Sequence, residues 1–328
     1  MELARGGDAF RVDAFEPAYL SLLRDGRLAE RAEEGLRALE ACRLCPRACE
    51  ARRLEGEPGT CGIGRHAVVS SAFPHLGEED CIRGRRGSGT VFFAGCGLRC
   101  AFCQNADLSW MRVGEEHDAE DLAAVFLDLQ ARGCHNLNLV TPSHVVPQVL
   151  EALASAAGRG LRLPVVYNSS GYDAVETLRL LDGVVDVYMP DFKFWRGESA
   201  GRYAAAPDYP ERARAAIVEM HRQVGPLRFD ACGLARRGVL VRHLVMPGLT
   251  GESAAVFEWL AREVSADTYV NVMGQYRPTF RVGEPDESGV PLFPEIARRP
   301  RPGEIEAALG SFRQAGLWRL DGRGPGAP

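Results

Sequence analysis

The sequence has 328 residues, of which 46% are apolar and 25% are charged. A chain of this length can bury a large core, either as one barrel-sized domain with an extension or as two ordinary domains. The formal net charge of −5 provides no basic surface for nucleic acid, and the arginines are interleaved with acidic residues. We therefore expect a globular protein with no nucleic-acid partner.

The amino-terminal sequence is charged where a signal peptide needs an apolar core, and no later stretch reaches about 18 uncharged apolar residues. We expect no membrane partner and a cytoplasmic location. Ten cysteines in such a chain are better explained as metal ligands than as disulfides, because the cytosol keeps thiols reduced.

The first part of the chain changes character at residue 42. Residues 16–41 have a helical pattern of leucine and alanine side chains near one face. Between residues 42 and 87 periodicity is weak and Gly, Pro and Arg are frequent, which predicts a loop-rich segment ordered by a metal or by a neighbouring domain. We expect Glu78 and Glu79, in this segment, to lie in a solvated turn; the alternative is that they help to seat the N-terminal segment over the mouth of the following domain.

Beyond residue 88, short apolar runs alternate with helical stretches. Six such units imply a parallel sheet with right-handed crossovers. We predict an α/β fold with this sheet rolled into a partial (β/α)6 TIM-type barrel; a doubly wound open sheet is the alternative. The predicted strands contain GTVFFAG, LNLVTP, PVVYNSS, VVDVYMPDFK, VLVRHLVMPG and TYVNVMGQY, and the predicted helices lie near residues 119–132, 144–156, 173–182, 209–224, 252–264 and 303–315.

These patterns divide the chain into four parts. We expect an N-terminal helical segment (1–41), a Cys-rich metal-binding segment (42–87), the partial barrel (88–316) and a C-terminal tail (317–328). In a barrel of this type, the chemistry is carried by the loops that follow the carboxyl ends of the strands.

Three cysteines follow the first predicted strand with the spacing C-x3-C-x2-C: Cys96, Cys100 and Cys103. Three thiolates are too few to close a structural zinc site, which normally has four protein ligands. They suit a [4Fe–4S] cluster whose fourth iron stays open for another ligand. The loop therefore predicts a catalytic iron–sulfur site.

The motif CGLRCAFC after a barrel strand resembles the radical S-adenosylmethionine superfamily. The resemblance implies that the open iron chelates the amine and carboxylate of S-adenosylmethionine. One electron then cleaves the sulfonium to methionine and a 5′-deoxyadenosyl radical, which removes a hydrogen atom from the substrate. The cofactors supply this chemistry, and the protein supplies orientation and excludes water.

Stretches between residue 42 and about residue 278 resemble a narrower group, the proteins similar to pyruvate formate-lyase activating enzyme. This resemblance implies hydrogen abstraction from a glycine of a partner glycyl-radical enzyme, with an electron donor such as flavodoxin or ferredoxin. The stretches are CRLCPRACEARRLEGEPGTCGIG, HLGEEDCIRGRRGSGTVFFAGCGLRCAFCQN, HNLNLVTPSH, DVYMPDFKFW, VRHLVMPG and NVMGQYRP.

Two other functions stay open. One is a radical enzyme that acts on a small molecule or a peptide. The other is an iron–sulfur electron carrier without catalysis, although a carrier cluster has four protein ligands and no open iron.

Polar residues at the strand ends predict a pocket for S-adenosylmethionine. The activating enzymes commonly carry Gly-Gly-Glu after strand two, where this sequence has VTPSH at residues 140–144. Hydroxyl groups are weaker partners than a carboxylate for the methionyl ammonium group. The expected pocket residues are Thr141, Ser143, Asn168, Ser169, Asp191 and Arg242.

A second group of cysteines precedes the barrel with the spacing C-x2-C-x3-C-x11-C. Four soft ligands in a stretch with little order of its own predict metal binding coupled to folding. A second iron–sulfur cluster and zinc are both compatible with thiolate ligands. This quartet consists of Cys42, Cys45, Cys49 and Cys61.

The other three cysteines stand apart from both groups. We expect Cys81, Cys134 and Cys232 to be small buried or half-buried apolar side chains rather than ligands.

Overall fold

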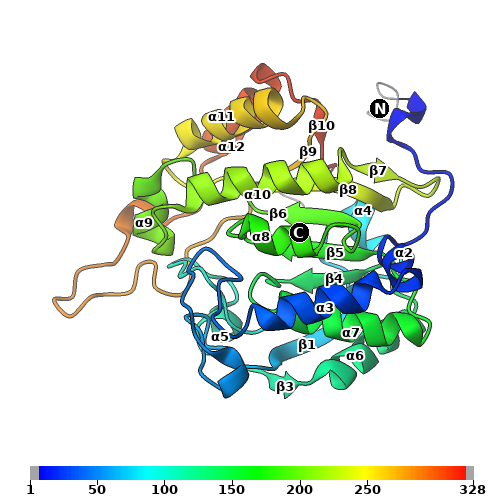
Figure 1. The fold of residues 1–328 in the computed structure, drawn as a ribbon. Helices are drawn as coiled ribbons and strands as arrows, with labels where there is room; N and C mark the ends of the chain where they lie inside the picture. Colours follow the sequence, from blue (N-terminus) through cyan, green and yellow to red (C-terminus); the bar gives the residue numbers. More distant parts are fainter. Residues whose placement is uncertain (1–6, 323–328) are drawn as a thin grey trace.

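A computed structural model describes residues 7–322, which form a mixed α/β structure around one central sheet (Figure 1). The strands follow the order β10-β9-β8-β6-β5-β4-β2-β1-β3, and β7 pairs with β8. Their bounds are β1 Ala67–His75, β2 Ser88–Phe93, β3 Glu115–His117, β4 Leu137–Val140, β5 Val165–Ser169, β6 Val187–Pro190, β7 Arg228–Phe229, β8 Ala235–Leu244, β9 Tyr269–Met273 and β10 Arg319–Leu320.

All six predicted strands are present, and each pairs in parallel with its neighbour in the order β2-β4-β5-β6-β8-β9. Strand β10 adds a seventh parallel strand beside β9. The predicted tail from residue 317 therefore contributes to the sheet; its last residues, 323–328, lie outside the described part, as do residues 1–6 at the start of the predicted helical segment. The parallel strands follow chain order without the reversal that defines a doubly wound sheet.

The helices also agree with the sequence pattern. Helix α6 begins after Asp118, whose carboxylate accepts the backbone N–H groups of Glu120 and Asp121, both at 2.9 Å. The α-helices are α2 Tyr19–Arg24, α3 Arg27–Arg37, α4 Asp80–Arg83, α5 Ala106–Ser109, α6 Ala119–Ala131, α7 Val146–Gly158, α8 Val175–Leu180, α9 Gly197–Ala204, α10 Tyr209–Val224, α11 Thr250–Trp259 and α12 Pro302–Gln314. After α11 the chain continues in a π-helical turn over Leu260–Val264. Among residues 7–322, no helix has the length and apolar character needed to cross a membrane.

The N-terminal helices pack against a helix of the sheet region rather than standing apart from it. Figure 1 shows α3 lying along α7, and a side-chain carbon placed on Gly35 would come 3.3 Å from the Cα of Pro147. Glycine permits this close approach because it has no Cβ. The helical pattern of residues 16–41 is thus confirmed as α2 and α3.

The structure corrects the expected loop character of residues 42–87, because β1 occupies nine of them. Strand β1 pairs antiparallel with β2 on one side and with β3 on the other. Only Ala67 and Val69 of β1 are fully buried, and Pro74 and exposed Phe73 interrupt an alternating pattern. The strand was therefore not visible as a period of two in the sequence.

The two faces of the parallel sheet are covered by different parts of the chain. Alternate residues point to opposite faces of a strand. On β5 and β6, Tyr167 and Tyr188 belong to the large core, whereas Val166 and Val187 pack in a separate cluster with Ile82 of α4. The short helix α4 therefore fills the face that the large core leaves open, and Glu78 and Glu79, which immediately precede it, are buried.

Candidate active site at the carboxyl edge of the parallel strands

The three-cysteine loop follows directly on β2. Backbone hydrogen bonds attach it to α9: Arg99 N donates to Ala204 O at 3.1 Å, and Ala101 N donates to Tyr203 O at 2.8 Å. Cys96 is buried, and Cys100 and Cys103 are half-buried. The loop thus has a defined conformation, and its thiols face the interior of the carboxyl edge.

The three thiols share one poorly hydrated environment. Burial raises the pKa of Cys96 to about 11, and the neighbouring charge of Cys103 adds to the rise. Burial raises the pKa of Cys100 further, and the Lys193 ammonium opposes the shift at both thiols. Thiols in such a place become thiolates when a cation compensates their charge, and an iron–sulfur cluster provides that compensation.

The number of cysteines in the loop suits a cluster with one open iron. Within residues 7–322, no three His, Cys, Asp or Glu side chains converge as the ligands of one metal ion. A [4Fe–4S] cluster binds each thiolate through a different iron, so its cysteines can surround a wider space. The donor set of Cys96, Cys100 and Cys103 therefore fits the predicted cluster.

Aromatic side chains surround the loop. Phe102 is buried, and its ring centroid lies 6.0 Å from that of Phe194 and 5.9 Å from that of Tyr276. These rings come from the segments that follow β6 and β9. They form an apolar wall that excludes water from one side of the cysteine loop.

Asp191, at the end of β6, is the centre of a charged network. Arg242 of β8 donates from Nε to Asp191 Oδ1 at 2.9 Å and from Nη2 to Asn168 Oδ1 at 2.7 Å, and Lys193 Nζ pairs with Asp191 Oδ2. Burial alone would raise the pKa of Asp191, but Arg242 and Lys193 hold it below the ordinary value. The structure thus brings together three predicted site residues, Asn168, Asp191 and Arg242. The aspartate and the arginine among them are ionised.

The structure corrects the expectation for Glu78 and Glu79, which are only 8% and 4% exposed. Arg242 Nη1 lies 3.9 Å from Glu78 Oε2, and Asn271 Nδ2 donates to Glu79 Oε1 at 2.9 Å. Burial raises the pKa of Glu79 to about 7, against the opposing charge of Arg242. An acidic pair after a glycine resembles an exposed turn in sequence; only the placement of α4 shows that it enters the site.

Two predicted hydroxyl residues have another partner in the structure. Ser143 Oγ and Ser169 Oγ donate to the buried Asp173 carboxylate at 2.5 and 2.6 Å, and Tyr167 donates to it at 2.9 Å. Burial raises the pKa of Asp173. Asp173 was missed in the sequence because it follows the strand end by four residues. Ser143 and Ser169 are thus brought together, in the loops after β4 and β5.

Thr141 is placed differently from the two serines. Its φ of 59° puts a β-branched residue in the left-handed region, and its N–H donates to Asn168 O at 2.9 Å. Such backbone strain persists only where the surroundings impose it. Thr141 and Asn168 are therefore fixed side by side at the ends of β4 and β5.

Tyr209 of α10 joins the loops after β5 and β6 through hydrogen bonds of its hydroxyl group. Its hydroxyl accepts the Lys193 N–H at 2.9 Å and lies 2.9 Å from the carbonyl oxygens of both Ser170 and Asp191. Gly171 has a φ of +76°, and a side-chain carbon there would come 2.2 Å from Asp191 O. The two loops are thus in contact, with no room for a side chain between them.

The quartet of cysteines lies against the three-cysteine loop. Arg47 Nε donates to Gly97 O at 2.7 Å, and a side-chain carbon on Gly97 would lie 3.4 Å from Cys45 Sγ. Two segments about 50 residues apart in sequence are therefore packed together. Among the isolated cysteines, Cys81 and Cys134 are buried as expected, but Cys232 is exposed in the turn between β7 and β8, so the prediction was wrong for Cys232.

Comparison with known proteins identifies a relative but not an activity. No family model matches the chain. A Methanocaldococcus jannaschii protein described as "Uncharacterized protein MJ0674" is 30% identical over 305 residues, which cover 90% of this chain and 81% of the relative. The chain belongs to the family of MJ0674. A solved structure described as "Native anSMEcpe with bound AdoMet" is 8% identical, with a TM-score of 0.45, over 67% of this chain and 57% of that chain.

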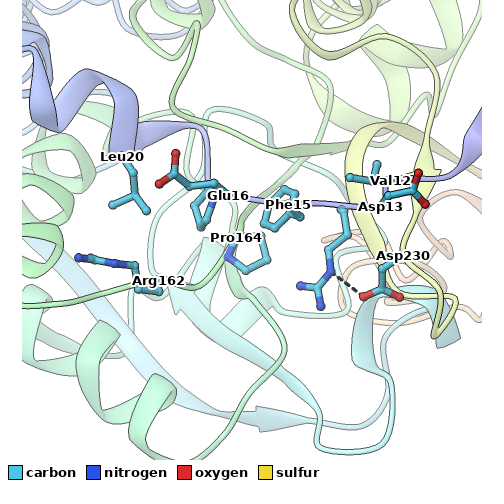
Figure 2. Close-up of a pocket in the computed structure, with 10 residues that line it drawn as sticks. Val12, Asp13, Phe15, Glu16, Leu20, Arg162, Pro164 and Asp230 are labelled. Atoms are coloured by element: carbon cyan, nitrogen blue, oxygen red, sulfur yellow. Dashed lines mark hydrogen bonds and ion pairs between the residues drawn. The ribbon is translucent and has the colours of Figure 1, made fainter.

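A surface hollow of about 420 Å³, lined by no residue of the quartet or of the three-cysteine loop, lies at the amino edge of the sheet (Figure 2). It lies beside Pro164, which immediately precedes β5. Figure 2 shows Arg162 on one side of the hollow and Asp230 on the other; Arg236 Nε donates to Asp230 Oδ2 at 2.8 Å. The carboxyl edge, and not this hollow, carries the residues that the sequence selected.

Proposed function

We propose that the protein is a radical S-adenosylmethionine enzyme. The observation that carries this proposal is the position of Cys96, Cys100 and Cys103, with the spacing C-x3-C-x2-C, at the carboxyl end of β2 and beside Lys193. When bound there, a [4Fe–4S] cluster with an open iron supplies the electron that cleaves S-adenosylmethionine to methionine and a 5′-deoxyadenosyl radical.

The residues around the loop suit the other parts of S-adenosylmethionine. Arg242 and Lys193 carry positive charges suited to the methionyl carboxylate. Asn168 and Asp191 offer acceptors to ribose hydroxyls, and Glu79 has an oxygen without a partner. The predicted pocket residues Thr141, Ser143 and Ser169 lie in the same loops; in this proposal Thr141 shapes the pocket wall, while the serines hold Asp173.

We propose that the parallel strands form a partial barrel with this site at its mouth. The strand order β2-β4-β5-β6-β8-β9-β10 follows the chain. The face opposite the large core holds α4 and its own small cluster, as expected for the inside of a curved sheet. The predicted segments 42–87 and 88–316 then form one unit, joined through the β1–β2 pair.

The substrate that we propose is a glycine of a partner glycyl-radical enzyme. A segment between β9 and α12 extends away from the body of the molecule near the cysteine loop (Figure 1). Its base is attached to that loop, because Arg281 N donates to Ala101 O at 3.1 Å, and its exposed tip is closed by the Pro285–Pro291 bridge. A projecting segment beside the site provides a surface on which a protein substrate can dock.

The test is electron paramagnetic resonance of the reconstituted, reduced protein mixed with S-adenosylmethionine and a co-encoded glycyl-radical enzyme. The protein in this sample is reduced with dithionite. In a parallel sample, the predicted electron donors, reduced flavodoxin or ferredoxin, take the place of dithionite. We expect a glycyl-radical doublet that depends on both S-adenosylmethionine and this protein. If a small metabolite or peptide stimulates deoxyadenosine formation and no doublet appears, the result would instead support the enzyme that acts on a small molecule or peptide. A cluster that is reduced and reoxidised without cleavage of S-adenosylmethionine would support the electron carrier.

A further inference from the structure

The quartet of cysteines has a glycine beside two of its sulfurs. Cys42, Cys45 and Cys61 are buried, and Cys49 is half-buried. A side-chain carbon on Gly59 would lie 3.2 Å from Cys49 Sγ and 3.5 Å from Cys61 Sγ. Any larger residue at position 59 would occupy the space between these two sulfurs.

Cys49 is held in place by a strained turn. Its two neighbours, Ala48 and Glu50, have φ values of 40° and 56°, in the left-handed region that residues with side chains rarely adopt. The backbone N–H of Glu50 donates to Cys42 O at 2.9 Å and closes the turn. Two such residues around one cysteine show that the fold imposes the direction of its side chain.

A buried cation accompanies the quartet. The guanidinium of Arg53 is fully buried; it donates to Gly64 O at 2.9 Å and to His144 O at 2.7 Å, and its Nη1 lies 3.6 Å from Cys42 Sγ. No carboxylate in residues 7–322 forms an ion pair with Arg53. Burying a cation without a counterion costs several kcal/mol. Thiolates bound to a metal at the quartet would provide that counterion.

The spacing of the sulfurs decides which metal fits. Zinc holds four sulfurs about 2.3 Å from one point, and so within about 4 Å of one another. The quartet has no three sulfurs that converge in this way, and neither does the three-cysteine loop proposed to hold a cluster. A [4Fe–4S] cluster does not require the sulfurs to converge on one point, because each thiolate binds its own iron.

From these contacts we infer that the quartet binds a second [4Fe–4S] cluster, with all four irons held by protein thiolates. A side-chain carbon on Gly97, the neighbour of Cys96, would lie 3.4 Å from Cys45 Sγ, and Gly97 O accepts a hydrogen bond from Arg47 Nε, so the second cluster would lie beside the loop of the first. The inference deepens the proposed function by adding a second centre, but it concerns a separate set of ligands and can be tested without the first set.

The first test uses the full-length chain with Cys96→Ser, Cys100→Ser and Cys103→Ser combined. After anaerobic reconstitution with iron, sulfide and zinc all present, we expect about four irons and four sulfides per chain and the charge-transfer absorption of a [4Fe–4S] cluster. One zinc per chain without iron, or no bound metal in a protein that keeps its native circular dichroism, would overturn the inference. Because the first set is absent, the result does not depend on S-adenosylmethionine cleavage.

The second test leaves every cysteine in place. Gly59→Val puts methyl groups between Cys49 and Cys61, whereas Gly251→Val adds the same groups at a position with no heavy atom within 4 Å. We expect iron to fall from about eight to about four per chain in Gly59→Val and to stay at about eight in the control. Unchanged iron in Gly59→Val would contradict the inference.

The position of the second cluster has its own test. Two reduced clusters this close should couple magnetically. The electron paramagnetic resonance spectrum of the reduced wild-type protein should therefore be broadened, and it should differ from the sum of the spectra of the two separate clusters. The spectrum of the quartet cluster alone is measured in the triple serine variant, and that of the first cluster alone in Cys42→Ser/Cys45→Ser. A simple sum of the two spectra would contradict a location of the quartet cluster beside the loop.

Discussion

Strand β6 has an aspartate at each end, and the structure holds the two in opposite ways. Asp186, before the strand, accepts the backbone N–H groups of Ala18 and Val165, both at 2.9 Å, and burial raises its pKa to about 7. Asp191, after the strand, is half-buried and pairs with Arg242 and Lys193, and these cations keep its pKa below the ordinary value.

The difference shows what each edge of the sheet does. Backbone N–H groups are dipoles fixed by the fold, so Asp186 attaches the N-terminal segment to β5 and serves stability. Arg242 and Lys193 carry full charges on side chains, which an incoming anionic ligand can share. The contacts of Asp186 at the amino edge therefore stabilise the fold, whereas the carboxyl edge carries charged side chains that can bind a ligand.

The largest contrast between the edges concerns two cysteines. Cys100→Ser at the carboxyl edge should abolish the first cluster and lower the bound iron by about four per chain, because a hydroxyl is a poor ligand for this cluster. Cys134→Ser, buried before β4 at the amino edge, should leave the iron content unchanged. Iron and sulfide analysis after reconstitution measures both. Equal iron content in the two variants would show that Cys100 is no more a cluster ligand than Cys134 is.

The two aspartates of β6 provide the next contrast. Asp191→Asn leaves Arg242 and Lys193 without a carboxylate, so we expect the affinity for S-adenosylmethionine to fall about ten- to a hundredfold, the range for a charged hydrogen bond. Asp186→Asn should leave that affinity unchanged and lower the free energy of unfolding by about 1–3 kcal/mol near pH 5. Equilibrium binding and denaturant unfolding measure the two effects. If Asp186→Asn weakened binding as much as Asp191→Asn, the edges would not differ.

The pKa of Asp186 predicts a pH dependence of stability. Between about pH 4 and pH 7 the folded state holds a proton on Asp186 that the unfolded state has released, so this group stabilises the fold less as the pH rises. Asp186→Asn has no such proton. The free energy of unfolding of the variant minus that of the wild type should therefore rise by up to about 1.4 kcal/mol per pH unit in this range. A constant difference across pH 4–7 would show that Asp186 titrates normally.

The smallest effect is expected at the hollow of Figure 2. Arg162→Ala changes a residue that lines this hollow, at the amino edge. Both the iron content and the affinity for S-adenosylmethionine should match the wild type. A loss of either would place part of the ligand site at the wrong edge of the sheet.

The sequence predicted the fold well where a local pattern set it. The strand-then-helix alternation gave six parallel strands because each buried strand is a short apolar run. Strand β1 was missed because it lies at an edge of the parallel strands with few buried positions, and β10 because two residues carry no pattern.

The candidate site could be predicted only in part. Cys96, Cys100 and Cys103 stand close together in the sequence, and Asn168, Asp191 and Arg242 follow or end strands, so both sets were found. Glu79 reaches the site through the packing of α4, and the contact between Cys45 and Gly97 depends on how distant segments fold together. Neither has a local signal.

The most direct test of the central claim is the cleavage of S-adenosylmethionine by the reconstituted wild-type chain under reducing, anaerobic conditions. The account predicts that 5′-deoxyadenosine and methionine form in equal amounts, and that neither forms in Cys100→Ser, while Cys134→Ser cleaves as the wild type does. A wild-type protein with both clusters bound that leaves S-adenosylmethionine intact would contradict the assignment of the carboxyl edge as a radical S-adenosylmethionine site.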